Sequence, residues 1–248
     1  MKAQRAASKS LLGPAIDALE GFYGRQAPGW PTDPFLFLIW WHCGYPPSEE
    51  RCGLGWDALT AAVGVTPAAL AAARSATLTR ALRAGGLVPE QRAARVRAIA
   101  RRVQAEFAGD LRAALARVPE ADARKLLREF PGIGAPGADR ILLFAALAPV
   151  AAVPSSCPQV PVRIQSGREG PKYGATYVQA RQLLEAQLPA TLAARSRAYL
   201  LLQRHGRQLC KSKNPQCGAC PICGSCAYFA SLSRAVRPRK PRLAARRR

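Results

Sequence analysis

Acidic residues are scarce in this sequence. Its 248 residues include 15 Asp and Glu against 37 Lys and Arg, which gives a formal net charge of +22 and a pI near 10.8. A protein that meets only neutral small molecules does not need such an excess of cations. Long apolar runs are scarce too, because the densest one, Phe35–Trp41, is far shorter than the roughly 20 residues that cross a bilayer. The composition therefore favours an anionic partner, above all nucleic acid, and no membrane.

The N-terminus is basic and lacks the apolar core of a signal peptide. We therefore expect a cytoplasmic protein, associated with the nucleoid if the cell is bacterial. In that reducing compartment, clustered cysteines are more often metal ligands than disulfides. Five of the eight cysteines lie within the short stretch 210–226, which makes this stretch the first candidate for a metal site.

The cysteine loop has a regular spacing. Its pattern C-x6-C-x2-C-x5-C lets four thiolates converge on one soft metal centre, and the residues are Cys210, Cys217, Cys220 and Cys226. Proline and glycine supply the turns between them, at Pro215, Gly218, Pro221 and Gly224. Cys223 is a surplus thiol. The loop alone leaves an iron–sulfur cluster, a zinc ion and disulfides as alternatives.

Helical patterns dominate the rest of the chain, so the fold class is all-α. The apolar run Phe35–Trp41 fits a buried helix or a strand by itself, but the absence of any other clear strand favours a helix. We interpret Trp40, Trp41 and His42 as core residues. Further helices are expected near residues 14–22, 56–63, 68–82, 89–107, 110–117, 120–129, 173–188 and 191–205. The third of these should begin with Thr66 as N-cap and Pro67 in the first turn.

Two prolines interrupt the pattern later in the chain. Pro158 and Pro161 should distort or delay the helix that follows them.

Residues 130–144 form a distinct motif. Gly132 and Gly134 flank Ile133 and allow a tight turn whose backbone N–H groups point outward beside the start of a new helix. Such a turn suits a phosphate, because the amides donate hydrogen bonds and the helix dipole favours negative charge. Pro136 is compatible with a first helical turn. An ordinary corner between two helices is the alternative interpretation.

The hairpin F-P-G-I-G, the following A-x-R-I-L-L-F and the cysteine loop downstream together resemble the endonuclease III family of helix-hairpin-helix DNA glycosylases over about residues 30–230. The resemblance implies an iron–sulfur cluster domain made of residues 1–37 and 149–230. It also implies a six-helix module over 38–148, with the helix-hairpin-helix at about 123–144. In that family the four cysteines hold a [4Fe-4S] cluster, so the resemblance assigns Cys210, Cys217, Cys220 and Cys226 to it. Cys223 lies outside the pattern and should be packed or exposed.

The family's catalytic positions are changed in this chain. Members that cleave the sugar backbone carry a lysine two residues after the second hairpin glycine, where this chain has Pro136. The family's aspartate aligns without gaps with Pro154 in A-V-P-S-S-C. The resemblance therefore implies glycosylase activity that is altered, weak or absent, and no lyase activity.

No other residue is assigned to catalysis. Five carboxylates could replace the missing ones by residue type, but we interpret them as solvated, namely Asp33, Glu49, Glu50, Asp139 and Glu169.

The chain ends in a basic tail, residues 231–248, which we expect to be disordered. Of the fifteen residues from Arg234 to Arg248, eight are cationic and none is acidic. Such arms contact phosphates without reading the base sequence.

The leading hypothesis is a monomeric iron–sulfur protein of base-excision repair that recognises damaged or distorted double-stranded DNA. The expected backbone contacts, besides the tail, are Gly132, Ile133, Gly134, Arg140, Lys211 and Lys213. The alternative is a redox-responsive or regulatory iron–sulfur DNA-binding protein without glycosylase chemistry, and a structural zinc module is a third possibility.

Overall fold

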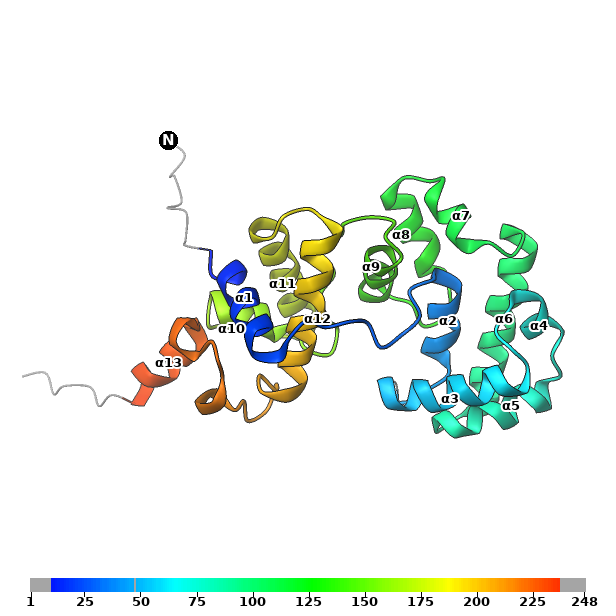
Figure 1. Cartoon of the computed structure of the whole chain (residues 1–248), viewed down its shortest axis with the longest axis horizontal. Coiled ribbons are helices and arrows are strands. Elements are labelled where there is room, and N and C mark those ends of the chain that lie inside the picture. Colours follow the sequence, from blue (N-terminus) through cyan, green and yellow to red (C-terminus); the bar gives the residue numbers. More distant parts are fainter. Residues whose placement is uncertain (1–9, 47, 237–248) are drawn as a thin grey trace, which may run out of the picture. The chain divides into compact units, whose positions relative to one another are not determined.

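The computed structural model describes residues 10–46 and 48–236, and in these residues the regular structure is helical (Figure 1). The helices form two compact units. The first comprises residues 10–25, 156–188 and 201–236, and the second comprises residues 26–155 and 189–200. The chain thus leaves the first unit after residue 25 and returns to it at 156, whereas the sequence prediction placed these boundaries at 37 and 148. The difference arises because Trp30, Phe35 and Val150 are buried in the core of the second unit.

The first unit contains five helices among its described residues. They are α1 (Leu12–Tyr23), α10 (Gln159–Gln165), α11 (Tyr173–Gln187), the C-terminal part of α12 (Leu192–Gln208) and α13 (Ala227–Val236). Helix α10 is central, because α1, α11 and α13 all pack against it. Pro161 lies in its first turn, where the missing N–H has no helical partner to lose, so α10 forms directly after Pro158.

The basic tail was predicted to begin at residue 231, but this residue lies inside helix α13. Residues 231–236 are helical, because the run A-Y-F-A-S-L-S-R-A-V contains no proline or glycine to end a helix. The rest of the predicted tail, residues 237–248, lies outside the described residues.

The second unit is built from nine helices within the described part of the chain. They are α2 (Pro34–His42), α3 (Glu49–Ala62), α4 (Pro67–Ala72), α5 (Ser75–Leu82), α6 (Pro89–Phe107), α7 (Leu111–Ala116), α8 (Glu120–Arg128), α9 (Ala135–Phe144) and the N-terminal part of α12. Helix α2 packs against α3, α6, α7 and α9, and it is apolar on every side. Its residues Phe35, Phe37, Leu38, Ile39 and Trp40 are all buried, so the predicted helix is confirmed. His42 is also in the core, and Trp41 is half-buried.

Two predicted helices have different limits. Helix α3 begins at Glu49 instead of residue 56, because Ser48 caps it by accepting a hydrogen bond from the N–H of Arg51 at 3.2 Å. Gly55, which precedes the predicted start of this helix, lies inside it and allows close approach, since a Cβ there would lie 2.0 Å from the Cys43 carbonyl oxygen. The predicted helix 68–82 is two helices, α4 and α5. Arg97 of α6 donates to the Ala73 carbonyl at the break between them.

None of the described helices is both long enough and apolar enough to cross a bilayer.

Arg92 of α6 is a buried hub in the second unit. Its side chain is 2% exposed and donates to four backbone carbonyls. These belong to Cys43 at 2.6 Å, Leu82 at 2.6 Å, Gly86 at 2.8 Å and Leu87 at 2.9 Å. The four carbonyls belong to the end of α2, the end of α5 and the loop before α6. One guanidinium thus joins the end of α2 to the segment that links α5 and α6.

Replacing Arg92 by Met should lower the free energy of unfolding by about 3 kcal/mol or more, because several buried carbonyls lose their donor. Arg101→Met is the control, since Arg101 is an exposed residue of the same helix and its substitution should change stability by less than about 0.5 kcal/mol. Urea denaturation followed by circular dichroism measures both. Equal midpoints for the two variants would contradict the role of Arg92.

Candidate functional site

The hairpin between α8 and α9 presents its backbone at the surface of the second unit. Gly132 and Gly134 are exposed, whereas Ile133 between them is 6% exposed and packs inward. Gly132 has φ +70°, a left-handed conformation that favours glycine. Gly134 is extended and serves as the N-cap of α9, with Pro136 in the first turn. The start of α9 and its favourable dipole therefore lie directly beside the exposed turn.

His42 anchors this hairpin to α2. Its Nε2 lies 2.8 Å from the carbonyl oxygen of Pro131, so Nε2 carries the proton and donates. Burial lowers the pKa of His42 to about 4, and the imidazole is therefore neutral at pH 7. The fit is close, because a Cβ on Gly132 would lie 3.2 Å from His42 Cε1.

An open cavity of about 550 Å³, including open solvent, lies beside the hairpin. Its lining residues all belong to the second unit and are Phe37, Trp41, Gly132, Ile133, Gly134, Pro136, Gly137, Arg140, Ser155 and Tyr199. Two of these lining residues lie at or next to the positions where the family's catalytic residues were expected. Pro136 is in the wall itself, and Ser155 directly follows the buried Pro154. The hairpin and both changed positions are thus associated with one cavity.

Arg140, predicted to contact the DNA backbone, lies in the wall of this cavity. It is 7% exposed, and its guanidinium carbon is 3.6 Å from the ring centroid of Trp30 and 5.0 Å from that of Phe37. Trp40 and Tyr199 follow at 5.9 and 5.7 Å. A cation surrounded by aromatic faces is stabilised by their quadrupoles. Arg140 therefore lies among aromatic rings at the cavity wall, and its contact with the DNA backbone stays a prediction.

Asp139 is not solvated, and the prediction for it was wrong. The residue is fully buried, and its Oδ1 accepts from Nε of Arg124 at 2.6 Å. Arg124 lies on α8, so this ion pair ties together the two helices of the hairpin.

Two of the other carboxylates also have structural roles. Asp33 caps α2 by accepting from the N–H of Leu36 at 3.0 Å, and Glu169 pairs with Arg163 at 2.6 Å.

The sequence interpretation missed an apolar tip, formed by Tyr45, Leu87 and Val88. Their side chains are 46%, 61% and 44% exposed. Backbone hydrogen bonds join the two segments, from the Tyr45 N–H to the Gly85 carbonyl at 3.0 Å and from the Leu87 N–H to the Tyr45 carbonyl at 3.1 Å. Val88 has φ +49°, which is unusual for a β-branched residue. The available signal was Leu-Val directly after Gly85-Gly86, two apolar residues in a turn.

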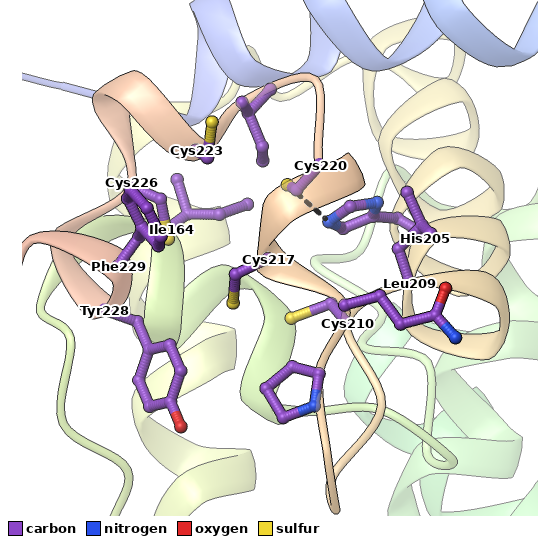
Figure 2. A pocket seen from close by; sticks show the side chains of 13 residues that line it. Ile164, His205, Leu209, Cys210, Cys217, Cys220, Cys223, Cys226, Tyr228 and Phe229 are labelled. Carbon is purple, nitrogen blue, oxygen red and sulfur yellow. Dashed lines mark hydrogen bonds between the residues drawn. The ribbon is translucent and has the colours of Figure 1, made fainter. Parts of the chain in front are cut away.

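The cysteine loop lines a second open cavity in the first unit, of about 350 Å³ including open solvent. All five thiols of the loop line it, together with mainly apolar side chains from α10, α12 and α13 (Figure 2). Short 3-10 turns at Cys217–Ala219 and Cys223–Ser225 shape the loop. The sequence spacing thus brings the four predicted ligands to one cavity. Cys223 borders it too, but in Figure 2 its sulfur points away from those of Cys210 and Cys217.

Arg163 of α10 holds the beginning of this loop. It is 3% exposed and donates to the carbonyls of Lys211 at 2.8 Å and Ser212 at 3.0 Å. Its Nη1 also lies 3.7 Å from Cys210 Sγ. Burial raises the pKa of the Cys210 thiol, and the hydrogen bond and charge of Arg163 oppose that rise. The predicted contact residues Lys211 and Lys213 are exposed on the same segment.

His205 lies on the other side of the cysteines. It is 1% exposed, and its Nδ1 is 3.0 Å from the Tyr23 hydroxyl while Nε2 is 3.7 Å from Cys220 Sγ. Burial raises the pKa of Tyr23 to about 12, so the hydroxyl keeps its proton. When Tyr23 donates to Nδ1, the ring proton of His205 lies on Nε2 and faces the sulfur.

The residues around this cavity fit an iron–sulfur cluster by their chemistry. Thiolates are the ligands that such clusters take, and Arg163 and His205 supply hydrogen-bonding groups to sulfur of the kind that tune these centres. Among the described residues, no group of three or more His, Cys, Asp and Glu side chains is arranged to hold a metal ion. The cluster therefore remains a prediction.

Comparison with known proteins gives the fold. No protein-family model matches the chain, and no curated protein matches it. Among solved structures, a trapped endonuclease III–DNA covalent intermediate matches with a TM-score of 0.70 and 18% identity, over 90% of this chain and 97% of that one. A thermostable thymine-DNA glycosylase matches with a TM-score of 0.69 and 19% identity, over 91% and 100%. The H. pylori 3-methyladenine DNA glycosylase MagIII, bound to 1,N6-ethenoadenine, gives 0.54 and 19%, over 79% and 94%. The predicted all-α helix-hairpin-helix glycosylase fold is confirmed.

The stability of the protein should depend on pH through His42. Its pKa is about 4 when folded and about 6.5 when unfolded, so the unfolded chain binds the proton more readily. The contribution to stability is complete above pH 6.5 and is lost as the pH falls toward 4, amounting to about 3 kcal/mol. His42→Gln keeps a donor for Pro131 but does not titrate, so urea midpoints should show a weaker pH dependence in this variant. Parallel pH profiles for the two proteins would contradict the assignment.

The two hairpin glycines should respond differently to substitution. Gly132→Ala should lower the free energy of unfolding by about 1–2 kcal/mol, because φ +70° is strained for alanine. Gly134→Ala is the matched control, since its backbone is extended and a Cβ there meets nothing closer than 3.7 Å. It should cost less than about 0.5 kcal/mol. Chemical denaturation of both variants measures this, and equal losses would contradict the described turn.

Proposed function

We propose that this protein is a monomeric DNA-binding protein of base-excision repair that recognises damaged or distorted double-stranded DNA. The observation that carries the proposal is the exposed backbone of Gly132 and Gly134 beside the N-terminus of α9. Backbone amides at a helix start bind phosphate oxygens. The likeness to a DNA complex of endonuclease III supports the same use of this fold.

Phosphate contacts would come from more than the hairpin. Lys211 and Lys213 are exposed on a segment whose carbonyls Arg163 holds in place. The net charge of +22 provides attraction at longer range. These contacts position a duplex but do not read its sequence.

The apolar tip supplies a way to distort a duplex. Proteins that kink DNA insert apolar side chains between base steps and partly unstack them. Leu87 and Tyr45 are exposed on a support that Arg92 holds from inside the second unit. We assign Tyr45, Leu87 and Val88 to contact with unstacked bases, where the favourable term is burial of apolar surface rather than charge.

The chemistry at the cavity is proposed to be altered. Proline offers no amine to attack a sugar, so Pro136 removes covalent lyase chemistry from its position. Pro154 offers no carboxylate to stabilise positive charge on a sugar, and Asp139 is occupied by Arg124. Glycosylase activity is therefore weak or absent, while binding is retained.

Cys210, Cys217, Cys220 and Cys226 are the proposed ligands of a [4Fe-4S] cluster. When bound, the cluster would hold the loop in shape and supply a redox-active centre. Arg163 contacts Cys210 Sγ and also holds the carbonyls beside Lys211. This shared contact favours, as a second candidate function, DNA binding that responds to the redox state of the cysteine centre.

Duplex affinity should fall steeply with salt, because each neutralised phosphate releases counterions. Lys211→Ala with Lys213→Ala should reduce the slope of log K against log salt by about 2. Leu87→Ala is the contrasting variant, since losing an apolar contact should weaken binding to a bulged duplex and leave the slope unchanged. Fluorescence anisotropy across a salt series measures all three proteins. Binding that is indifferent to salt would contradict the proposal.

Protein purified without oxygen should contain about four iron and four sulfide per chain, with broad visible absorption. Cys217→Ser should lose both. Cys157→Ser is the control, because Cys157 is buried away from the cavity lining, and it should keep both. A colourless protein that carries zinc would contradict the cluster assignment.

A further inference from the structure

His205 is a polar residue buried in an apolar part of α12. Its side chain is 1% exposed, and the preceding turn buries Leu201 and Leu202. A buried imidazole is costly unless its nitrogens have partners. Both nitrogens of His205 have one, because Nδ1 lies 3.0 Å from the Tyr23 hydroxyl and Nε2 lies 3.7 Å from Cys220 Sγ (Figure 2). The imidazole therefore bridges α1 and the cysteine loop.

The main chain of His205 also contacts this loop. Its carbonyl oxygen accepts hydrogen bonds from the N–H of Leu209 and from the N–H of Cys210, both at 2.9 Å. Cys210 is the first of the four proposed ligands, and Cys220 is the third. One residue thus contacts the loop at two points, and this restricts movement of the ring relative to the sulfur.

The direction of the two hydrogen bonds follows from the state of Cys220. A cysteine that binds a metal is a thiolate, which accepts hydrogen bonds and has no proton to donate. The proton between the ring and the sulfur must then be on His205 Nε2. A neutral imidazole with its proton on Nε2 accepts at Nδ1, and the Tyr23 hydroxyl is the donor placed there. Tyr23 thus selects the tautomer whose N–H faces Cys220.

We propose that Tyr23 and His205 are positioning residues that raise the reduction potential of the cysteine centre, an inference that rests on the [4Fe-4S] cluster proposed above. An electron added to such a centre increases the negative charge on its ligating sulfurs, and a fixed N–H donor stabilises that charge. Hydrogen bonds to sulfur are among the factors that set the potential of iron–sulfur clusters. The proton stays on Nε2 in both redox states.

The pair of Tyr23 and His205 allows a cleaner test than Arg163 does. Arg163 also approaches a ligand sulfur, with Nη1 3.7 Å from Cys210 Sγ, but it holds two loop carbonyls as well. Replacing Arg163 would therefore change the loop itself. Tyr23→Phe instead keeps the ring of residue 23 and the imidazole of His205, and it removes the donor to Nδ1.

A potentiometric titration with redox dyes, followed by visible absorption, measures the midpoint potential of each protein after its iron has been counted. His205→Leu should lower the ratio of reduced to oxidised centre about tenfold at a fixed potential, which is about 59 mV for a one-electron couple. Tyr23→Phe should shift the potential in the same direction by less, because the imidazole remains but its N–H is no longer held toward the sulfur. His205→Gln should recover part of the loss, since its amide offers an N–H in place of Nε2.

Tyr228→Phe is the matched control. Tyr228 lines the same cavity, but in Figure 2 its hydroxyl points away from the cysteine sulfurs, so this variant should keep the wild-type potential. The inference is overturned if His205→Leu and Tyr23→Phe retain iron and keep the wild-type potential, or if Tyr228→Phe shifts as much as Tyr23→Phe. Should His205→Leu lose its iron, the potential of Tyr23→Phe decides alone. A wild-type protein without iron would instead contradict the proposed cluster, and the inference with it.

Discussion

The hydrogen bond from His42 to the Pro131 carbonyl is the constraint on which the exposed hairpin depends. It joins the buried helix α2 to a turn whose two glycines are exposed. Burial keeps the imidazole neutral. Its Nε2 carries the ring proton and donates the hydrogen bond to the Pro131 carbonyl. Because Gly132 lies against the same ring, the left-handed turn and the histidine fix each other. The exposed backbone of Gly132 and Gly134, which is the proposed phosphate contact, is thereby held on a packed support.

Each unit also uses a buried arginine as a connector. Arg92 binds four carbonyls in the second unit, and Arg163 binds the start of the cysteine loop in the first. In both cases the guanidinium satisfies backbone groups of irregular segments, which would otherwise be buried without donors. These irregular segments carry the candidate functional groups, namely the apolar tip and the cysteines. Arg140 differs, because its surroundings are aromatic rings around a cavity.

The fold could be predicted because its signals are local. The apolar run Phe35–Trp41 and the helix start at Thr66-Pro67 can each be recognised from neighbouring residues alone. The same is true of the glycine hairpin and of the cysteine spacing. The start of α3 was predicted too late, because the close contact that Gly55 permits with Cys43 is not visible in the local sequence. Asp139 and Arg140 could not be placed from sequence. The partner of Asp139 is on the preceding helix, and the rings around Arg140 come from α2, α12 and the loop before α2. The exposure of the Leu87 side chain likewise could not be predicted from sequence, because it depends on how other parts of the chain pack.

We propose that this fold retains DNA binding while Pro136 and Pro154 remove the lyase chemistry. A duplex with one abasic site tests it most directly, because an amine that attacks the sugar is trapped by borohydride as a covalent adduct. The protein should shift this duplex in a gel without borohydride and yield no covalent adduct when borohydride is present. A covalent protein–DNA band on a denaturing gel would contradict the account, because some amine other than the missing lysine would then be attacking the sugar.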